Sequence, residues 1–82
     1  MYYVYIIESL QNGRYYIGAT DNIARRVKEH NIGKSKSTKP YTPYRLVYKE
    51  EFNSLIEARK RENFIKKCKS RKYIRELIAK KV

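Results

Sequence analysis

The chain has 82 residues, a formal net charge of +12 and 41% hydrophobic residues. This length predicts one small domain, residues 1–82, with a modest core, and the hydrophobic content argues against full disorder. No apolar run approaches the ~20 residues of a membrane-spanning helix, and there is no signal-peptide pattern. The single cysteine, Cys68, excludes an internal disulfide and favours the reducing cytoplasm.

The positive charge points to a polyanionic partner. A net charge of +12 on so short a chain repels itself in the folded state. Binding to nucleic acid is the commonest way in which proteins use such a charge. An anionic membrane surface is the alternative, but no membrane partner is expected.

Residues near the N-terminus predict a β-hairpin. Tyr2–Glu8 is rich in β-branched and aromatic residues, as strands are, and both of its faces are apolar. This favours a strand that is covered on both sides. Asn12-Gly13 is a strong hairpin signal because both residues tolerate a positive φ. The segment Arg14–Ala19 is then the antiparallel partner.

The register of this hairpin decides how close two tyrosines come. A two-residue turn would place Tyr5 opposite Thr20 and Ser9 opposite Tyr16. Tyr5 and Tyr16 would then share one face at about 13 Å along the strand, and a bulge or a longer loop would bring them closer. Gly18 lies on the same face and, without a side chain, lets another group approach the sheet.

A helix follows the hairpin. Thr20 or Asp21 is expected to cap it, and Gly33 ends it shortly after His30. At about 100° per residue, Ile23 and Val27 form the buried stripe.

The same periodicity separates two neighbouring arginines. Arg26 and His30 are one helical turn apart and flank the buried stripe, whereas Arg25 points away. Helix geometry alone therefore selects Arg26 as the arginine that faces the protein.

The middle of the chain predicts a loop and a third strand. Lys34–Pro43 is polar and basic, ends in two prolines and is expected to be mobile. Tyr44–Glu50 alternates as a strand with one wet face, so Tyr44, Leu46 and Tyr48 are expected to share a side.

A second helix carries an unusually placed carboxylate. Ser54 and Glu57 form a capping-box start, and Glu62 falls in the middle of an apolar stripe that contains Leu55, Ala58 and Ile65. Burying an unpaired carboxylate is costly. Two interpretations stay open with nearly equal weight: a salt bridge to a partner such as Arg26, or a metal ligand at the wall of a cleft.

Ser70 is expected to cap a last helix, whose apolar side carries Ile74, Leu77 and Ile78. The predicted order is strand, strand, helix, strand, helix, helix. This order predicts an α/β (α+β) domain in which helices flank a small sheet.

With these residues placed, the chain resembles the small stand-alone members of the GIY-YIG nuclease superfamily. The resemblance rests on Tyr3-Val4-Tyr5, on Tyr16-Ile17-Gly18, on Arg26 ten residues after Tyr16, on His30, and on Ala58-x-x-x-Glu62-x-x-Ile65-Lys66. Three positions depart from the family pattern. Tyr3 stands where the first half-motif has glycine, Ala19 stands where some members have lysine, and Ile74 lies near the position of a family asparagine.

The resemblance implies a three-stranded, mixed but largely antiparallel sheet flanked by three helices, and a divalent-metal-dependent endonuclease. Glu62 would hold one weakly bound Mg²⁺ or Mn²⁺ ion, and Arg26 would bind the scissile phosphate. Tyr16, or a water that it activates, would be the base, with Tyr5 in support and His30 as an auxiliary group. The implied substrate is DNA in preference to RNA.

Selectivity would come from nucleic-acid structure or from a protein partner, because the chain has no second domain to recognise sequence. Phosphate backbones are expected to contact a set of basic residues, with salt-sensitive binding: Lys34, Lys36, Lys39, Lys66, Lys67, Lys69 and Arg71. Each candidate site residue also has a purely structural interpretation, such as a tyrosine in the core or a lysine in solvent. Cys68 is expected to be a small buried residue. The rival functions are a non-catalytic nucleic-acid-binding module and an RNA-associated protein of ribosomal type.

Overall fold

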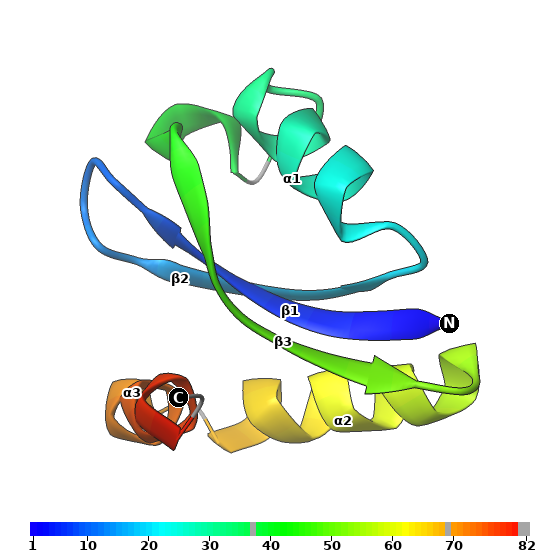
Figure 1. Cartoon of the computed structure of the whole chain (residues 1–82). Coiled ribbons are helices and arrows are strands. Elements are labelled where there is room, and N and C mark those ends of the chain that lie inside the picture. The colour runs from blue at the N-terminus through cyan, green and yellow to red at the C-terminus, as the bar shows by residue number, and fades with distance from the viewer. Residues whose placement is uncertain (37, 69, 81–82) are drawn as a thin grey trace.

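A three-stranded sheet with the order β2-β1-β3 separates one helix from two others (Figure 1). The structure, a computed structural model, describes residues 1–36, 38–68 and 70–80. Along the chain the elements are β1 (Tyr2–Ser9), β2 (Tyr15–Thr20), α1 (Ile23–Asn31), the short 3₁₀ helix η1 (Lys39–Tyr41), β3 (Tyr44–Phe52), α2 (Leu55–Cys68) and α3 (Arg71–Lys80). The predicted α+β class and element order are confirmed. Both pairings of β1 are antiparallel, so the sheet has no parallel pair within the described residues.

The central strand β1 is buried on both faces, as its two apolar faces predict. Val4 and Ile6 pack with Ile65 in the larger core cluster, on the side of α2 and α3. Tyr5 and Ile7 pack in a smaller cluster under α1. Figure 1 shows α1 on one side of the sheet and α2 and α3 on the other. Burying each such apolar side chain contributes about 1.5–3 kcal/mol.

The β1–β2 hairpin is confirmed, but the predicted two-residue turn is wrong. The connection runs from residue 10 to residue 14, because the Ser9 hydroxyl accepts hydrogen bonds from the backbone N–H groups of Gln11 and Asn12 and thereby supports a longer loop. Gly13 within this loop has a φ of 74°.

The longer loop shifts the register by two residues. Tyr5 lies opposite Gly18, where Thr20 was expected, and Ile7 lies opposite Tyr16, where Ser9 was expected. A shift of two keeps every side chain on its predicted face. It brings Tyr5 to within two residues of Tyr16 along the ladder, or about 7 Å.

The third strand contains an irregularity that the alternating pattern does not predict. Ile6 pairs with Tyr48 and Ile7 pairs with Leu46, so Val47 is an extra residue on β3. The expectation that Tyr44, Leu46 and Tyr48 share a face is therefore wrong. Tyr44 packs under α1, whereas Tyr48 packs on the α2 and α3 side, because a bulge reverses the alternation.

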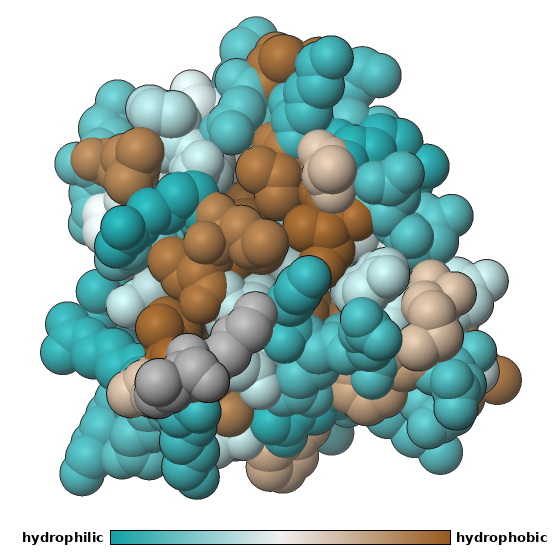
Figure 2. All heavy atoms as spheres, in the orientation of Figure 1, coloured by the Kyte–Doolittle hydropathy of each residue, from teal (hydrophilic) through white to brown (hydrophobic). Residues whose placement is uncertain are grey.

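The distribution of hydrophilic and apolar residues on the surface agrees with this arrangement of the sheet and helices. Figure 2 shows hydrophilic residues above and below a band of apolar residues that runs across the middle of this face. Leu46 on the edge strand β3 is 40% exposed, although the alternating pattern placed it on the same side as Tyr44 and away from the wet face. In the described part of the chain, no helix is long and apolar enough to cross a membrane.

The helix caps are mostly as predicted. The side chain of Asn22 accepts the N–H of Arg25 and caps α1, so the expectation that Thr20 or Asp21 is the cap is wrong by one or two residues. The Ser54 hydroxyl accepts the N–H of Glu57 at the start of α2. The equivalent bond of Ser70 to the N–H of Tyr73 caps α3, and Gly33 follows α1 with a φ of 81°.

Cys68 is exposed, so the expectation that it is buried is wrong. It is the last residue of α2, and the last buried residue of that helix is Ile65. The helix therefore extends past its packing against the sheet before the chain turns into α3.

Candidate active site

The first part of the site is a tyrosine packed across a glycine on the sheet. A Cβ atom built on Gly18 would fall within 3.0 Å of the hydroxyl oxygen and two ring carbons of Tyr5. The absence of a side chain at Gly18 is therefore what allows the Tyr5 ring to lie across β2. The group expected to approach the sheet at this glycine is Tyr5 itself, and the longer hairpin loop places it there.

A buried chain of hydrogen bonds holds the Tyr5 hydroxyl. It lies 3.0 Å from Nε2 of His30, and Nδ1 of His30 lies 2.8 Å from the Thr38 hydroxyl. Thr38 donates its own proton to the carbonyl of Ser35 at 3.4 Å, so its oxygen accepts from Nδ1–H. Nε2 is then the acceptor and Tyr5 is the donor, an assignment made from the hydrogen-bond network.

The electrostatics agree with this assignment. Burial, with the positive charge of Arg26, holds the pKa of His30 below its usual value, which favours the neutral imidazole. Burial also raises the pKa of the Tyr5 hydroxyl, although Arg26 opposes that shift. In this state the Tyr5 hydroxyl keeps its proton and is the hydrogen-bond donor to Nε2 of His30.

Tyr16 occupies a different position. Its ring packs edge-on against His30, with 4.9 Å between the ring centroids. It is only partly buried and lines a cavity of about 170 Å³. Tyr5 and Tyr16 therefore meet at the same histidine, and Tyr16 is the more accessible of the two.

Helix α1 directs Arg26 towards this cavity, as its periodicity predicts. The Arg26 side chain is 33% exposed and its Nη1 lies 3.0 Å from a carboxylate oxygen of Glu29. Arg25 is 54% exposed and pairs with Asp21 at the surface. Among these two arginines, only Arg26 lines the cavity that contains Tyr5 and Tyr16.

Helix α2 contributes the carboxylate. Glu62 is 7% exposed and lines the same cavity. Its Oε2 lies 2.6 Å from Nζ of Lys66, one turn further along the helix. The salt bridge that the sequence left open therefore exists, but with Lys66, whereas Arg26 pairs with Glu29. Because Glu62 also faces the cavity, its role as a metal ligand stays a prediction.

Arg59 is the site residue that the sequence analysis missed. It lines the cavity beside Glu62 and Ala19. The signal was present, because residues three apart on a helix lie on the same face and Arg59 precedes Glu62 by three. An exposed arginine in a chain with this many basic residues did not stand out from the composition alone.

The structure thus brings four of the five predicted catalytic residues to one cavity at the edge strand β2. We call it the catalytic cavity after the predicted catalytic residues that line it; its full lining is Tyr5, Tyr16, Gly18, Ala19, Arg26, Arg59 and Glu62. The fifth predicted residue, His30, is fully buried behind it and reaches it only through the two tyrosines. Two arginines, a carboxylate and two phenols suit a phosphoryl group and its attacking water.

The side chains fit a divalent cation only in part. No group of three or more His, Cys, Asp or Glu residues that could hold a metal lies in the described part of the chain. Mg²⁺ keeps several waters and binds through one or two carboxylates together with substrate phosphates. Glu62 therefore fits an ion that arrives with the substrate better than a resident ion.

The predicted phosphate-contacting residues lie in two regions. Lys34, Lys36 and Lys39 are exposed in the connection between α1 and β3. Lys66 and Arg71 line a second cavity beside β2. Lys67 is exposed near the end of α2, and Lys69 lies outside the described residues.

Known proteins are similar to this chain in both sequence and fold. The family model described as "GIY-YIG catalytic domain" matches residues 1–74. A UPF0213 protein of Halobacterium salinarum is 46% identical over 67 residues, which cover 80% of this chain and 86% of that protein. A UPF0213 protein of Staphylococcus haemolyticus is 46% identical over 66 residues, which cover 79% of each chain.

A solved structure agrees with these matches. The solution NMR structure of a UPF0213 protein from Bacillus halodurans is 38% identical, with a TM-score of 0.62, and the match covers 99% of this chain and 86% of that one. The two half-motifs, Arg26, His30 and Glu62 occupy one continuous part of the fold in this chain. The chain belongs to the GIY-YIG family, whose catalytic domain is of the nuclease type.

Proposed function

We propose that this protein is an endonuclease that hydrolyses DNA phosphodiester bonds with one divalent metal ion, and that it selects nucleic-acid structure and not sequence. The observation that carries the proposal is the meeting of Glu62 from α2 with Arg26 from α1 in one cavity that also exposes Tyr16. These residues come from three different elements, so the stability of any one helix or strand does not explain why they lie together.

The two arginines supply the phosphate-binding charge. Arg26 and Arg59 approach the cavity from α1 and α2, on either side of β2. A guanidinium forms charge-assisted hydrogen bonds to phosphoryl oxygens, which are about twice as strong as neutral ones. Donors fixed around the developing charge lower the barrier to hydrolysis, because they need no reorganisation during the reaction.

Tyr16 is the residue that would hold or deprotonate the attacking water. The Tyr5 hydroxyl is committed to His30 and burial raises its pKa, so Tyr5 keeps its own proton and is not free to take one from water. Tyr5 and His30 act as support, because they fix the position of the Tyr16 ring through the contact between Tyr16 and His30.

Glu62 would hold the metal ion through its carboxylate oxygens. A bound divalent ion stabilises negative charge on the phosphoryl and leaving oxygens. Lys66 binds Oε2 of Glu62 at 2.6 Å and therefore competes for that oxygen. This competition predicts weak metal binding in the absence of nucleic acid.

The same ion pair favours a second candidate function, a nucleic-acid-binding module without turnover. Lys66 already neutralises Glu62, so the buried carboxylate has a structural explanation that needs no metal. The basic surface serves binding as well as cleavage.

The test is to incubate labelled single-stranded, duplex and branched DNA, and the equivalent RNAs, with the protein and Mg²⁺ or Mn²⁺, or with chelator. We expect metal-dependent cleavage of DNA that falls about 10²–10³-fold in Arg59→Ala, the usual effect of removing one charge-stabilising donor. Glu62→Gln and Tyr16→Phe should abolish it. Glu76→Gln and Lys60→Ala, at exposed positions outside the catalytic cavity, should cleave as the wild type does.

Two results would overturn the proposal. The binding module would be correct if no substrate were cut while wild type and Glu62→Gln bound DNA equally well. Cleavage that persists in chelator, or in Glu62→Gln, would remove the metal from the mechanism.

A further inference from the structure

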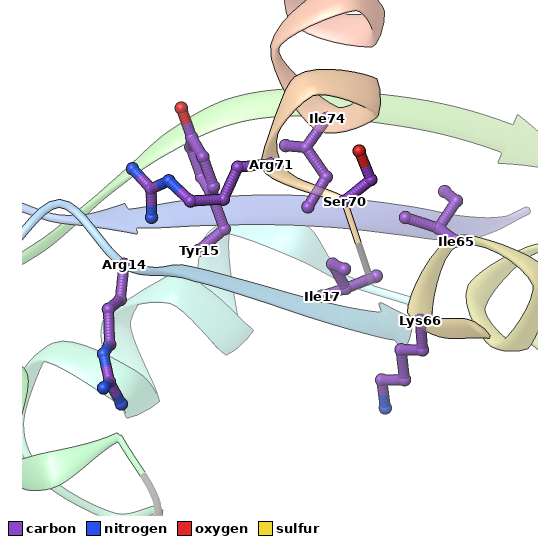
Figure 3. Close-up of a pocket in the computed structure, with 8 residues that line it drawn as sticks. All are labelled: Arg14, Tyr15, Ile17, Ile65, Lys66, Ser70, Arg71 and Ile74. Carbon is purple, nitrogen blue, oxygen red and sulfur yellow. The ribbon is translucent and has the colours of Figure 1, made fainter. Parts of the chain in front are cut away.

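A second cavity, of about 210 Å³, lies between β2, the end of α2 and the start of α3 (Figure 3). The proposed function does not use it. Its lining divides into an apolar part formed by Ile17, Ile65 and Ile74 and a cationic part formed by Arg14, Lys66 and Arg71. Figure 3 shows that Arg14 and Lys66 extend to the same side of β2, while the isoleucines gather between the strand and the two helices.

The charge of this second cavity differs from that of the catalytic cavity. Its described lining contains three cationic side chains, of which Lys66 is paired with Glu62, and no carboxylate of its own, whereas the catalytic cavity includes Glu62. An apolar surface beside several cations fits a ligand that is flat and apolar at one end and anionic at the other. A nucleotide has this chemistry, because its base stacks and its phosphate is charged.

Arg71 and Tyr15 form a stacking platform at one end of the cavity. The Arg71 guanidinium lies 5.0 Å from the centroid of the Tyr15 ring, and its Nη2 donates to the carbonyl of Gly13 at 3.2 Å. Figure 3 shows the Arg71 side chain reaching towards Tyr15. The hairpin loop therefore holds the guanidinium plane in place, and such planes and aromatic rings are the surfaces on which unpaired bases stack.

The second cavity adjoins the catalytic cavity. Tyr15 and Ile17 line the second cavity, while Tyr16 and Gly18 of the same strand line the catalytic cavity. Successive residues of a strand point to opposite faces at about 3.3 Å each, so the two cavities are about 10 Å or less apart along β2. Lys66 connects them directly, because it lines the second cavity and its Nζ binds Glu62 of the first.

We propose that the second cavity binds one unpaired nucleotide of the nucleic acid whose backbone lies at the catalytic cavity. A base stacked within a duplex cannot enter it, so the cavity would select bulges, flaps and strand junctions. This inference rests on the proposed nucleic-acid substrate and deepens it, because it places structure selectivity in particular residues. Arg71 and Tyr15 stack on the base, and Lys66 and Arg14, which extend to the opposite side of β2 from Arg71, bind the phosphates of the flanking backbone.

The test compares binding to a fully paired duplex and to the same duplex with one unpaired 2-aminopurine nucleotide, in chelator, by fluorescence anisotropy. One stacked base contributes about 1–3 kcal/mol, so wild type should bind the bulged duplex at least about fivefold more tightly. Arg71→Glu should lose this preference. Arg75→Glu is the matched control, because Arg75 is an exposed arginine one turn further along α3 and does not line the cavity.

The unpaired base provides a second measurement. Stacking should quench the 2-aminopurine fluorescence in wild type and in Arg75→Glu, but not in Arg71→Glu. The inference is overturned if wild type shows no preference, if both variants lose affinity for the two duplexes equally, or if polyglutamate displaces the bulged duplex as well as DNA does. The last result would show that the cavity binds acidic chains in general.

The outcome is separable from that of the proposed function, because binding in chelator requires no turnover. A preference for the bulge without cleavage under any condition would support the second cavity and refute the nuclease. Metal-dependent cleavage without this preference would support the nuclease and refute the second cavity.

Discussion

Substituting alanine for Gly18 tests the arrangement on which the catalytic cavity depends. The new Cβ would lie within 3.0 Å of the Tyr5 hydroxyl oxygen and two of its ring carbons. Tyr5 is 1% exposed and its hydroxyl is bound to His30, so the ring has little room to move. Any movement that relieves the clash also breaks that hydrogen bond.

The expected loss of stability can be built from these interactions. Overpacking a filled core costs about 1–3 kcal/mol, and losing the bond between Tyr5 and His30 costs about 0.5–1.5 kcal/mol. Replacing glycine restricts the unfolded chain and returns about 0.4–1 kcal/mol. The net free energy of unfolding should fall by about 0.5–4 kcal/mol, with a middle value of about 2 kcal/mol. With a urea m-value of about 1–3 kcal/mol per molar, the midpoint should fall by about 1 M.

Urea unfolding of a double-mutant cycle identifies the cause. In a Tyr5→Leu background the shorter side chain no longer crosses position 18, so Gly18→Ala should cost much less than in wild type. A coupling energy of at least about 1 kcal/mol is expected for residues that touch. Equal costs in the two backgrounds, or a stable Gly18→Ala in an otherwise wild-type chain, would refute the packing of Tyr5 across this glycine.

Two further predictions concern charge. Because burial lowers the pKa of His30 in the folded state, the unfolded chain takes up the proton first as the pH falls below about 6.5. Stability is therefore complete above that pH and is lost progressively as the pH falls below it. His30→Gln should flatten this part of the profile of urea midpoint against pH, and an unchanged slope would contradict the assignment. Replacing Lys34, Lys36 and Lys39 together with alanine should make the slope of log affinity for duplex DNA against log salt shallower, by about 0.9 for each phosphate that these lysines neutralise in the wild type. An unchanged slope in titrations at several salt concentrations would show that this connection does not bind phosphates.

Local patterns were sufficient to predict the three strands and the α-helices, but not η1 within the expected loop, and to select four of the residues that line the catalytic cavity. Caps such as Ser54 and Ser70 act within a few residues of the helices they begin, so the sequence around them is enough to place them. The periodicity of α1 likewise distinguished Arg26 from Arg25, because the buried face of a helix follows from its own apolar residues.

The tertiary structure decided what depends on long-range pairing. The Ser9 hydroxyl that supports the hairpin loop also donates to the carbonyl of Tyr41, far along the chain, and the bulge at Val47 moved Tyr48 to the opposite face from Tyr44. Neither feature has a periodic signal. Both change which side chains meet, because pairing depends on the count of residues between strands.

The residues that line the two cavities show the same distinction between local sequence pattern and tertiary packing. Sequence alone determined that the chain carries Glu62, Arg59 and a large excess of cations. Only the packing of α2 against β2 placed Arg59 and Glu62 in one cavity with Tyr16 and Arg26. Helical and strand periodicity determine which face a residue occupies, whereas the partner of that face is determined by the packing of elements that lie far apart in the chain.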